Sequence, residues 1–147
     1  MLVDQFHFQL LKCFNQQKRW INQRTIQIDV LPGQSKILQC LDEYGPLSPK
    51  EIGNLCIIDK STTTSLLNKM EKMVYIEKKS QDHDKRSIQI HLTALGKEKT
   101  QLVNQICLES NQVLLQGLSK KEQQEIIYLL KQINNTLEKE NVHGNTK

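Results

Sequence analysis

The apolar residues of the first thirty positions follow the spacing of a helix. Between positions 4 and 28 they recur at three- and four-residue steps, from Phe6 and Leu10 to Trp20, and neither Pro nor Gly interrupts them. Steps of this size place side chains on one face of an α-helix. The pattern predicts one long amphipathic helix over residues 4–28.

A break in the chain and a second apolar pattern predict the next helix. Pro32 and Gly33 interrupt the sequence, and Pro32 suits the first turn of a helix that contains Ile37 and Leu41. The Gly45-Pro46 pair is expected to end this helix, because neither residue favours its continuation.

Two capping signals predict a short helix followed closely by a longer one. Ser48 precedes Pro49 and lies three residues before Glu51, which is the spacing of a capping box at a helix N-terminus. Asp59 is a second capping residue. The helix that it opens has an apolar face made of Leu66, Leu67, Met70 and Met73. Its opposite face consists of Ser61, Thr62, Ser65, Asn68 and Lys69.

After Met73 the period of the pattern changes from about 3.6 residues to 2. Residues 75–79 and 88–92 alternate in polarity or are rich in residues that favour strands, and the polar segment 80–87 (SQDHDKRS) separates them. This arrangement predicts a β-hairpin with a charged tip.

The C-terminal third of the chain predicts two further helices. Thr93 can cap a helix that runs to about Gly117, and Ser119 with Glu122 forms a second capping box. The helix opened by this box has apolar residues at steps of four, three and four, the spacing of a coiled-coil seam: Ile126, Leu130, Ile133 and Leu137. The tail from Glu140 is expected to be frayed or disordered.

This order of elements indicates a winged helix-turn-helix. We expect a mainly α fold with a small β-hairpin wing, in one domain over residues 1–147. Residues 31–93 would form the DNA-binding lobe, between flanking helices at 4–30 and 95–140. Hydroxyl side chains on an outer helix face let the backbone approach DNA, donate to phosphates and offer methyl groups to thymine. The alternative is an ordinary amphipathic helix rich in Ser and Thr.

Four segments of the chain match the pattern of one known family. They are LPGQSKILQCL (31–41), GPLSPKEIGNLCIIDKSTTTSLLNKMEK (45–72), DHDKRSIQIHLTALGKE (82–98) and LSKKEQQEIIYLLKQI (118–133). With them the chain resembles the MarR-type (multiple antibiotic resistance regulator) winged-helix transcription factors. The most specific piece is Asp84-Lys85-Arg86, which is similar to the family's Asp-x-Arg wing motif. The resemblance implies that the Arg enters the minor groove and that the Asp orients it.

Three departures from the family pattern concern the same lobe. Ile57 stands in the turn where the family often has Gly, Ser65 stands where a basic residue is common, and Val74 stands where Gly frequently precedes the wing strand. The DNA sequence preferred by relatives is therefore not carried over to this chain.

The candidate DNA-contacting residues lie on the helix opened by Asp59 and at the tip of the hairpin. They are Lys60, Ser61, Thr62, Thr64, Ser65, Lys69, Asp84, Lys85 and Arg86. A two-fold dimer should prefer double-stranded DNA with a pseudo-palindromic operator whose half-sites are about 10 base pairs apart.

The apolar seams of the flanking helices are longer than a small winged-helix lobe can cover. The resemblance implies that a second copy of the chain covers them, in a homodimer. The alternative is a bundle within one chain, which predicts a monomer. A third function to be distinguished is a winged-helix module that binds other proteins and not DNA.

Regulation is the least determined property. The resemblance implies a repressor released by a small-molecule effector, and Phe14, Trp20, Arg24 and Tyr44 are candidates for the effector pocket or, alternatively, core residues. Cys13 lies in the region where some relatives carry a redox-sensing cysteine, so a thiol-based sensor is a second interpretation. The four cysteines are scattered singly along the chain, and buried free thiols are the default expectation.

Composition and charge narrow the class of protein further. The chain has 147 residues, 20 Lys+Arg against 16 Asp+Glu, and a net charge of +4, which permits an anionic partner. No nucleophile elbow, phosphate-binding Gly loop or clustered catalytic constellation is present, so neither an enzyme nor a cofactor is expected. The histidines are too dispersed for a metal site. No apolar run reaches the roughly 20 residues of a membrane span, and Asp4 and His7 disfavour a signal peptide, so a soluble cytoplasmic protein is expected.

Overall fold

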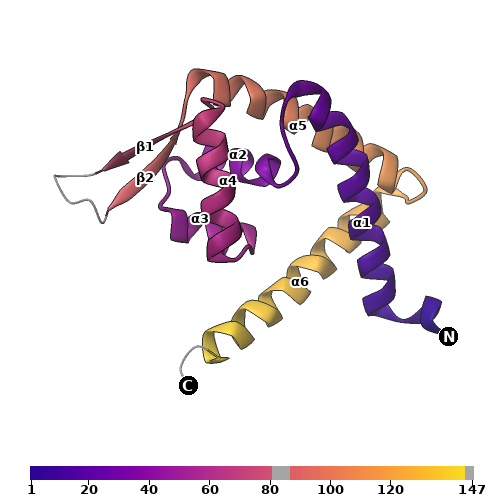
Figure 1. The fold of residues 1–147 in the computed structure, drawn as a ribbon. Helices are drawn as coiled ribbons and strands as arrows, with labels where there is room; N and C mark the ends of the chain where they lie inside the picture. Colours follow the sequence, from indigo (N-terminus) through magenta and orange to yellow (C-terminus); the bar gives the residue numbers. More distant parts are fainter. Residues whose placement is uncertain (81–86, 145–147) are drawn as a thin grey trace. The chain divides into compact units, whose positions relative to one another are not determined.

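The computed structural model describes residues 1–80 and 87–144, with side chains described up to residue 141. It divides into two compact units, Met1–Ser110 and Asn111–Lys147. The mainly helical architecture with one β-hairpin confirms the predicted fold class (Figure 1). The single domain over residues 1–147 stays a prediction.

The predicted helix over residues 4–28 is shorter than expected. A 3-10 turn at Leu2–Asp4 precedes the helix α1, Phe6–Thr25, and a second 3-10 turn follows at Ile26–Ile28. Asp29 then adopts a left-handed conformation with φ 62°, and its carbonyl accepts a hydrogen bond of 2.6 Å from the Tyr75 hydroxyl. The prediction of one continuous helix was wrong at its C-terminal end, because a contact with a distant residue holds the chain out of the helix.

Helix α2, Gln34–Tyr44, begins two residues later than the expected proline start. Gly33 is its N-cap residue, with φ 88°, so Pro32 lies before the helix and not in its first turn. A side chain at position 33 would also crowd Leu66, whose Cδ2 would lie 3.1 Å from an added Cβ. The left-handed conformation therefore favours Gly at position 33, and the packing against α4 leaves little room for a Cβ there. The helix ends at Gly45, as predicted.

Both predicted helix starts in the middle of the chain are confirmed. The Ser48 hydroxyl accepts from the Glu51 amide at 3.1 Å, and the Ser48 amide donates to the Glu51 carboxylate at 3.2 Å, at the start of α3 (Pro49–Cys56). Asp59 caps α4 (Lys60–Lys72) by accepting from the Thr62 amide at 2.7 Å. The two helices of the predicted helix-turn-helix are therefore bounded by their own local sequence.

The ends of α3 and α4 share an unusual backbone feature. Ile57 follows α3 with φ 55°, and Val74 follows α4 with φ 64°. In each case the next amide bonds back across the helix end: Ile58 to the Gly53 carbonyl and Tyr75 to the Met70 carbonyl, both at 3.0 Å. This left-handed termination normally uses Gly. Two of the three positions at which the sequence departs from the family pattern, Ile57 and Val74, thus keep the conformation that Gly favours.

The hairpin predicted after α4 is present. Strand β1 (Ile76–Ser80) pairs antiparallel with β2 (Ile88–Leu92), with Ile76 opposite Leu92 and Ser80 opposite Ile88 (Figure 1). Leu47 forms a bridge to Ile90, which attaches the base of the hairpin to the segment between α2 and α3. The tip, residues 81–86, lies outside the described residues.

Helix α5, Ala94–Leu115, starts at the cap predicted from Thr93, whose hydroxyl accepts from the Gly96 amide at 3.0 Å. At Gly96 the helix passes the Tyr75 carbonyl so closely that an added Cβ would overlap the carbonyl oxygen. The same carbonyl accepts from the Thr93 amide at 3.1 Å. The start of α5 is therefore fixed against the chain that enters the wing.

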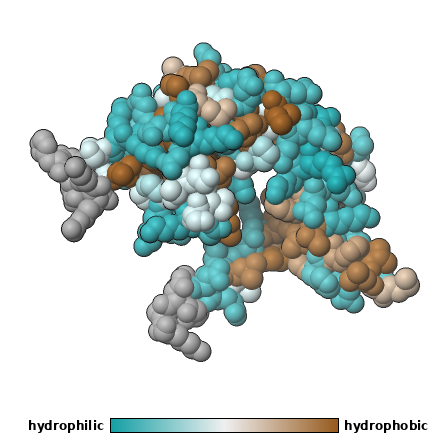
Figure 2. Space-filling model, in the orientation of Figure 1, coloured by the Kyte–Doolittle hydropathy of each residue, from teal (hydrophilic) through white to brown (hydrophobic). Residues whose placement is uncertain are grey.

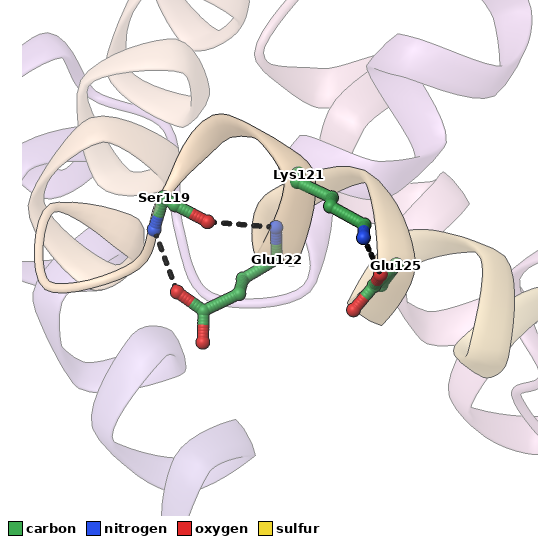
Figure 3. A network of polar contacts seen from close by, with 4 residues as sticks. All are labelled: Ser119, Lys121, Glu122 and Glu125. Atoms are coloured by element: carbon green, nitrogen blue, oxygen red, sulfur yellow. Dashed lines mark hydrogen bonds and ion pairs between the residues drawn. The ribbon is translucent and has the colours of Figure 1, made fainter.

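Helix α6, Lys120–Gly144, starts at the second predicted capping box. The Ser119 hydroxyl accepts from the Glu122 amide at 3.1 Å and the Ser119 amide donates to the Glu122 carboxylate at 2.9 Å (Figure 3). Lys121 pairs with Glu125 at 3.9 Å one turn later (Figure 3). The helix continues beyond Glu140 to Gly144, so the expectation of a frayed tail from Glu140 was wrong over that stretch.

The buried apolar residues of the structure form one cluster in the first unit. They come from the segment before α2, from α2, α3, α4, the wing and the first half of α5: Val30, Ile37, Leu38, Leu41, Leu47, Ile52, Leu67, Met70, Tyr75, Ile76, Ile90 and Val103. This core holds the helix-turn-helix and the base of the wing together, and it thereby fixes the surface that α4 presents to solvent.

Candidate nucleic-acid interface

Helix α4 exposes one row of hydrogen-bonding side chains. Thr64, Ser65 and Asn68 lie three, four and seven residues after Ser61, which places the four side chains on a single helix face. Together with Lys60 they line an open depression of about 590 Å³. The opposite face carries the buried residues Thr63, Leu67 and Met70. The core therefore turns this polar row outward.

The N-terminus of α4 is organised by Asp59. Hydrogen bonds from the Thr62 amide and the Thr62 hydroxyl, at 2.7 and 2.9 Å, hold the pKa of the Asp59 carboxyl below its usual range. Asp59 is consequently ionised at neutral pH and engaged in the cap. Thr63, the next residue along the helix, is buried and donates from its hydroxyl to the Asp59 carbonyl at 2.8 Å.

The predicted contact residues of α4 do not all share the exposed row. Thr62 uses its hydroxyl in the cap and lines a different cavity, described below, so the structure separates it from Ser61 and Ser65. Lys69 is exposed but does not line the depression. Thr64 donates its hydroxyl to the Lys60 carbonyl at 2.9 Å, which leaves its oxygen lone pairs and its methyl group toward solvent.

A second, larger groove of about 860 Å³ adjoins the same helix. Its lining comes from the N-terminal half of α3, the start of α4 and the beginning of β2: Ser48, Pro49, Lys50, Gly53, Asn54, Ile58, Lys60, Thr63, Thr64, Ser87, Ile88 and Gln89. Lys50 and Asn54 were not among the predicted contact residues. Their separation of four residues on α3, outside the apolar pattern, was the available signal.

A lysine of the wing, which was not among the predicted contact residues, contacts α4. Lys78 of β1 donates to the Asn68 side chain at 2.7 Å and lies 3.7 Å from the Glu71 carboxylate. This places a cation beside the polar row of α4. The predicted wing residues Asp84, Lys85 and Arg86 lie outside the described residues, so their contacts stay a prediction.

The predicted effector residues are dispersed in the structure. Phe14 lines a cavity of about 380 Å³ between α1, α2 and α4, together with Lys18, Lys36 and Thr62 among others. Trp20 and Arg24 do not line it; the Arg24 guanidinium lies 3.4 Å from the Trp20 ring centroid instead. Tyr44 is 61% exposed at the end of α2. Of the four candidates, only Phe14 reaches this cavity.

The cysteines differ from the default of buried single thiols. Cys13 is exposed, and Cys40, Cys56 and Cys107 are partly buried. Cys40 and Cys56 are 16 residues apart in sequence, yet their sulfur atoms lie 3.5 Å from each other. All four thiols are free, as expected, but the expectation that they are buried was wrong for Cys13 and holds only in part for the other three. The packing of α2 against α3 brings Cys40 and Cys56 together.

Among residues 1–80 and 87–144, no group of three or more His, Cys, Asp and Glu side chains could hold a metal ion. Within the same residues, no helix is both long enough and apolar enough to span a membrane.

The winged helix-turn-helix class is defined by three features, all present here. Two helices are joined by a tight turn, the second of them turns a polar row outward, and an antiparallel hairpin adjoins it. Within that class, residues 32–88 match the model described as the MarR family. The chain is therefore similar to the MarR family in this segment, and the resemblance found in its sequence motifs is confirmed.

Two curated relatives cover parts of the chain. An uncharacterized HTH-type transcriptional regulator, YkoM of Bacillus subtilis, is 29% identical over 68% of this chain and 65% of its own length. The HTH-type transcriptional regulator SarZ of Staphylococcus epidermidis is 31% identical over 48% of this chain and 47% of its own length. The chain thus spans less than two thirds of the length of either relative.

Solved structures share the fold over most of the chain. A probable transcriptional regulator from Pseudomonas aeruginosa superimposes with a TM-score of 0.80 at 24% identity, covering 90% of this chain and 99% of that protein. A variant of MarR from E. coli, complexed with operator DNA, gives a TM-score of 0.76 at 22% identity, covering 84% and 89%. At these identities the likeness concerns the fold.

Proposed function

We propose that the chain is a homodimeric DNA-binding transcriptional regulator that acts as a repressor and is released by a small-molecule effector. The observation that carries the proposal is the outward row of Ser61, Thr64, Ser65 and Asn68 on α4, beside a hairpin wing. Two relatives are transcriptional regulators and one similar structure is a complex with operator DNA, which supports the same function.

The chemistry of the row suits a helix in the major groove. An Asn side chain can pair with both hydrogen-bonding groups of an adenine edge, and Ser or Thr can bond to bases or phosphates. Lys60 at the first position of α4 supplies a cation for the phosphate backbone. Short side chains at positions 61, 64 and 65 let the helix backbone approach the groove closely.

Replacement of Ser65 by Glu tests the row directly. A carboxylate in the groove would face phosphates and base acceptors, so we expect duplex DNA affinity to fall by about 10- to 100-fold. Fluorescence anisotropy on a duplex selected from a random pool measures the affinity. Gln101→Glu adds the same charge at an exposed position of α5 and should bind nearly as the wild type does. An equal loss of DNA affinity in both variants would mean that net charge alone, and not the position of Ser65, causes the effect.

Asp84 and Arg86 are proposed to act as a unit at the wing tip. Arg86→Ala should weaken DNA binding by roughly 1 to 3 kcal/mol. Little change in melting temperature is expected, because a segment as polar as SQDHDKRS is not expected to belong to the core. Arg86→Lys should retain only part of the DNA affinity that Arg86→Ala loses, since the planar fork of the guanidinium is absent from lysine.

Asp84→Ala separates two explanations of the wing. If only net charge matters, removal of this acidic side chain should strengthen DNA binding. If Asp84 orients Arg86, its removal should weaken DNA binding. The same anisotropy titration decides the sign. Tighter binding by Asp84→Ala would reject the paired role and leave the wing as a loose electrostatic contact.

Dimerisation is supported by apolar side chains that the chain leaves exposed. On α6 the seam residues Ile126, Leu130 and Leu137 are 40%, 41% and 56% exposed. Phe6, Leu10 and Leu11 are exposed on α1. Figure 2 shows hydrophobic surface over both helices. Such faces are covered when a second copy packs against them.

Sedimentation should therefore give a mass near twice the 17.1 kDa of the chain. Ile133→Asp places an unpaired charge in the proposed seam and should leave monomer or aggregate. Asn135→Asp introduces the same side chain on the opposite face of α6 and should remain dimeric. A wild-type monomer at micromolar concentration, independent of dilution, would contradict the proposal.

The effector is proposed to enter the cavity of about 380 Å³ next to Phe14. Lys18 and Lys36 supply positive charge there, while Phe14, Ile21 and Leu66 supply apolar contact. This lining fits a small aromatic carboxylate. Because Thr62 and Leu66 of α4 also line the cavity, an occupant would contact the helix proposed to read DNA.

A further inference from the structure

Helices α2 and α3 bring two thiols into direct contact inside the first unit. Cys40 lies near the middle of α2, and Cys56 is the last residue of α3. Their sulfur atoms are 3.5 Å apart, close enough for one thiol to donate to the other sulfur. Both side chains are partly buried, so a small reagent can reach them while the helices keep them together.

We propose that Cys40 and Cys56 form an oxidisable dithiol, which a hydroperoxide converts to an intrachain disulfide. One thiolate attacks the peroxide oxygen and becomes a sulfenic acid, with release of hydroxide when the oxidant is hydrogen peroxide. The second thiol then attacks that sulfur and expels water. Overall, two thiols and one hydrogen peroxide give one disulfide and two waters, so the hydroperoxide is reduced as the cysteines are oxidised.

The surroundings of the pair assign the two roles. Burial, together with the hydrogen bond to Cys40, raises the pKa of the Cys56 thiol to about 12. Cys56 therefore keeps its proton at neutral pH and serves as the second, resolving thiol. The attack on the peroxide falls to Cys40. Lys36 lies one helical turn before Cys40 on α2, and its charge opposes part of the rise in the pKa of Cys56.

Disulfide formation would displace the turn that leads into α4. A disulfide has a sulfur separation of about 2.05 Å, so the two sulfurs must approach by roughly 1.5 Å. Three buried residues anchor α2 in the core: Ile37, Leu38 and Leu41. The adjustment is therefore concentrated at the end of α3, where Ile57 is already left-handed and Asp59 caps α4. A change there re-aims the polar row.

The first experiment tests the chemistry without DNA. The reduced full-length protein is treated with a small excess of hydrogen peroxide, and tryptic peptides are mapped by mass spectrometry without reduction. Cleavage after Lys36, Lys50 and Lys60 places Cys40 in peptide 37–50 and Cys56 in peptide 51–60. We expect these two peptides to be linked, with a loss of about 2 Da relative to the free thiols, and to separate on addition of dithiothreitol.

Three variants control the assignment. The linked peptide should be absent from Cys40→Ser and Cys56→Ser and should persist in Cys13→Ser, which removes the exposed thiol of α1. Over-oxidation of Cys40 without a cross-link would overturn the proposal. So would oxidation of Cys13 while Cys40 and Cys56 stay reduced.

The effect on DNA rests on the proposed function and is measured separately. Oxidised Cys13→Ser protein should bind duplex DNA at least about fivefold more weakly than the reduced form, the lower end of common coupling strengths. Dithiothreitol should restore the affinity. Equal affinity of both forms would overturn the regulatory effect but leave the disulfide in place. Failure of the reduced protein to bind any duplex would instead reject the proposed function, and the peptide map would still stand.

Discussion

Gly96→Ala is expected to lower the free energy of unfolding by several kcal/mol, although the same change in most helices is stabilising. Ala is ordinarily better than Gly inside a helix by about 0.5 to 1 kcal/mol. At Gly96 the added Cβ would overlap the Tyr75 carbonyl oxygen, which is backbone and cannot rotate away. Overpacking of this kind costs about 1 to 3 kcal/mol or more. The steric cost therefore reverses the usual sign.

Urea denaturation followed by circular dichroism measures the change. Gly117→Ala is the matched control, because nothing lies within 4 Å of an added Cβ at that position. It should unfold within about 0.5 kcal/mol of the wild type. If Gly96→Ala were as stable as this control, the close approach of α5 to the Tyr75 carbonyl would be wrong.

The affinity for duplex DNA is expected to fall by about three to five orders of magnitude between about 50 and 200 mM salt, if the dimer neutralises about 6 to 10 phosphates. The segment from Ser48 to Arg86 has only a small surplus of basic over acidic residues. Additional phosphate contacts would come from α1, which carries Lys12, Lys18, Arg19 and Arg24 and no acidic residue. Each phosphate contact releases counterions and steepens the salt dependence.

Titrations at four or five salt concentrations give the slope of affinity against salt. Lys12→Gln together with Lys18→Gln should flatten the slope if α1 contributes contacts, whereas Lys131→Gln on α6 should leave it unchanged. A slope near zero for the wild type would contradict binding through the phosphate backbone. It would favour the alternative of a winged-helix module that binds proteins.

The starts of α3, α4 and α6 could be predicted from the sequence because they depend on near neighbours. Ser48 with Glu51, Ser119 with Glu122 and the Asp59 cap each satisfy backbone amides three residues away. The end of α1 could not be predicted in the same way. It depends on the Asp29 carbonyl and the Tyr75 hydroxyl, which are 46 residues apart in sequence.

The candidate site shows the same division. Helical spacing correctly separated the outward residues Ser61 and Ser65 from buried Leu67, since period alone determines the face. It could not reveal that Thr62 is engaged by Asp59 and faces a cavity shared with α1. Nor could spacing reveal the contact of Cys40 with Cys56, because that contact requires two helices to pack.

The left-handed residues that end α3 and α4 have a consequence for how the lobe folds. A β-branched residue in this conformation costs about 1 to 2 kcal/mol relative to an ordinary helical one. Before the core forms, the local sequence therefore does not favour termination of α4 at Val74. The helical conformation can then extend to Tyr75 and Ile76. Strand β1 needs Ile76 in an extended conformation, opposite Leu92. Termination of the helix and pairing of the wing must accordingly occur together, in one cooperative step driven by burial of Tyr75 and Ile76.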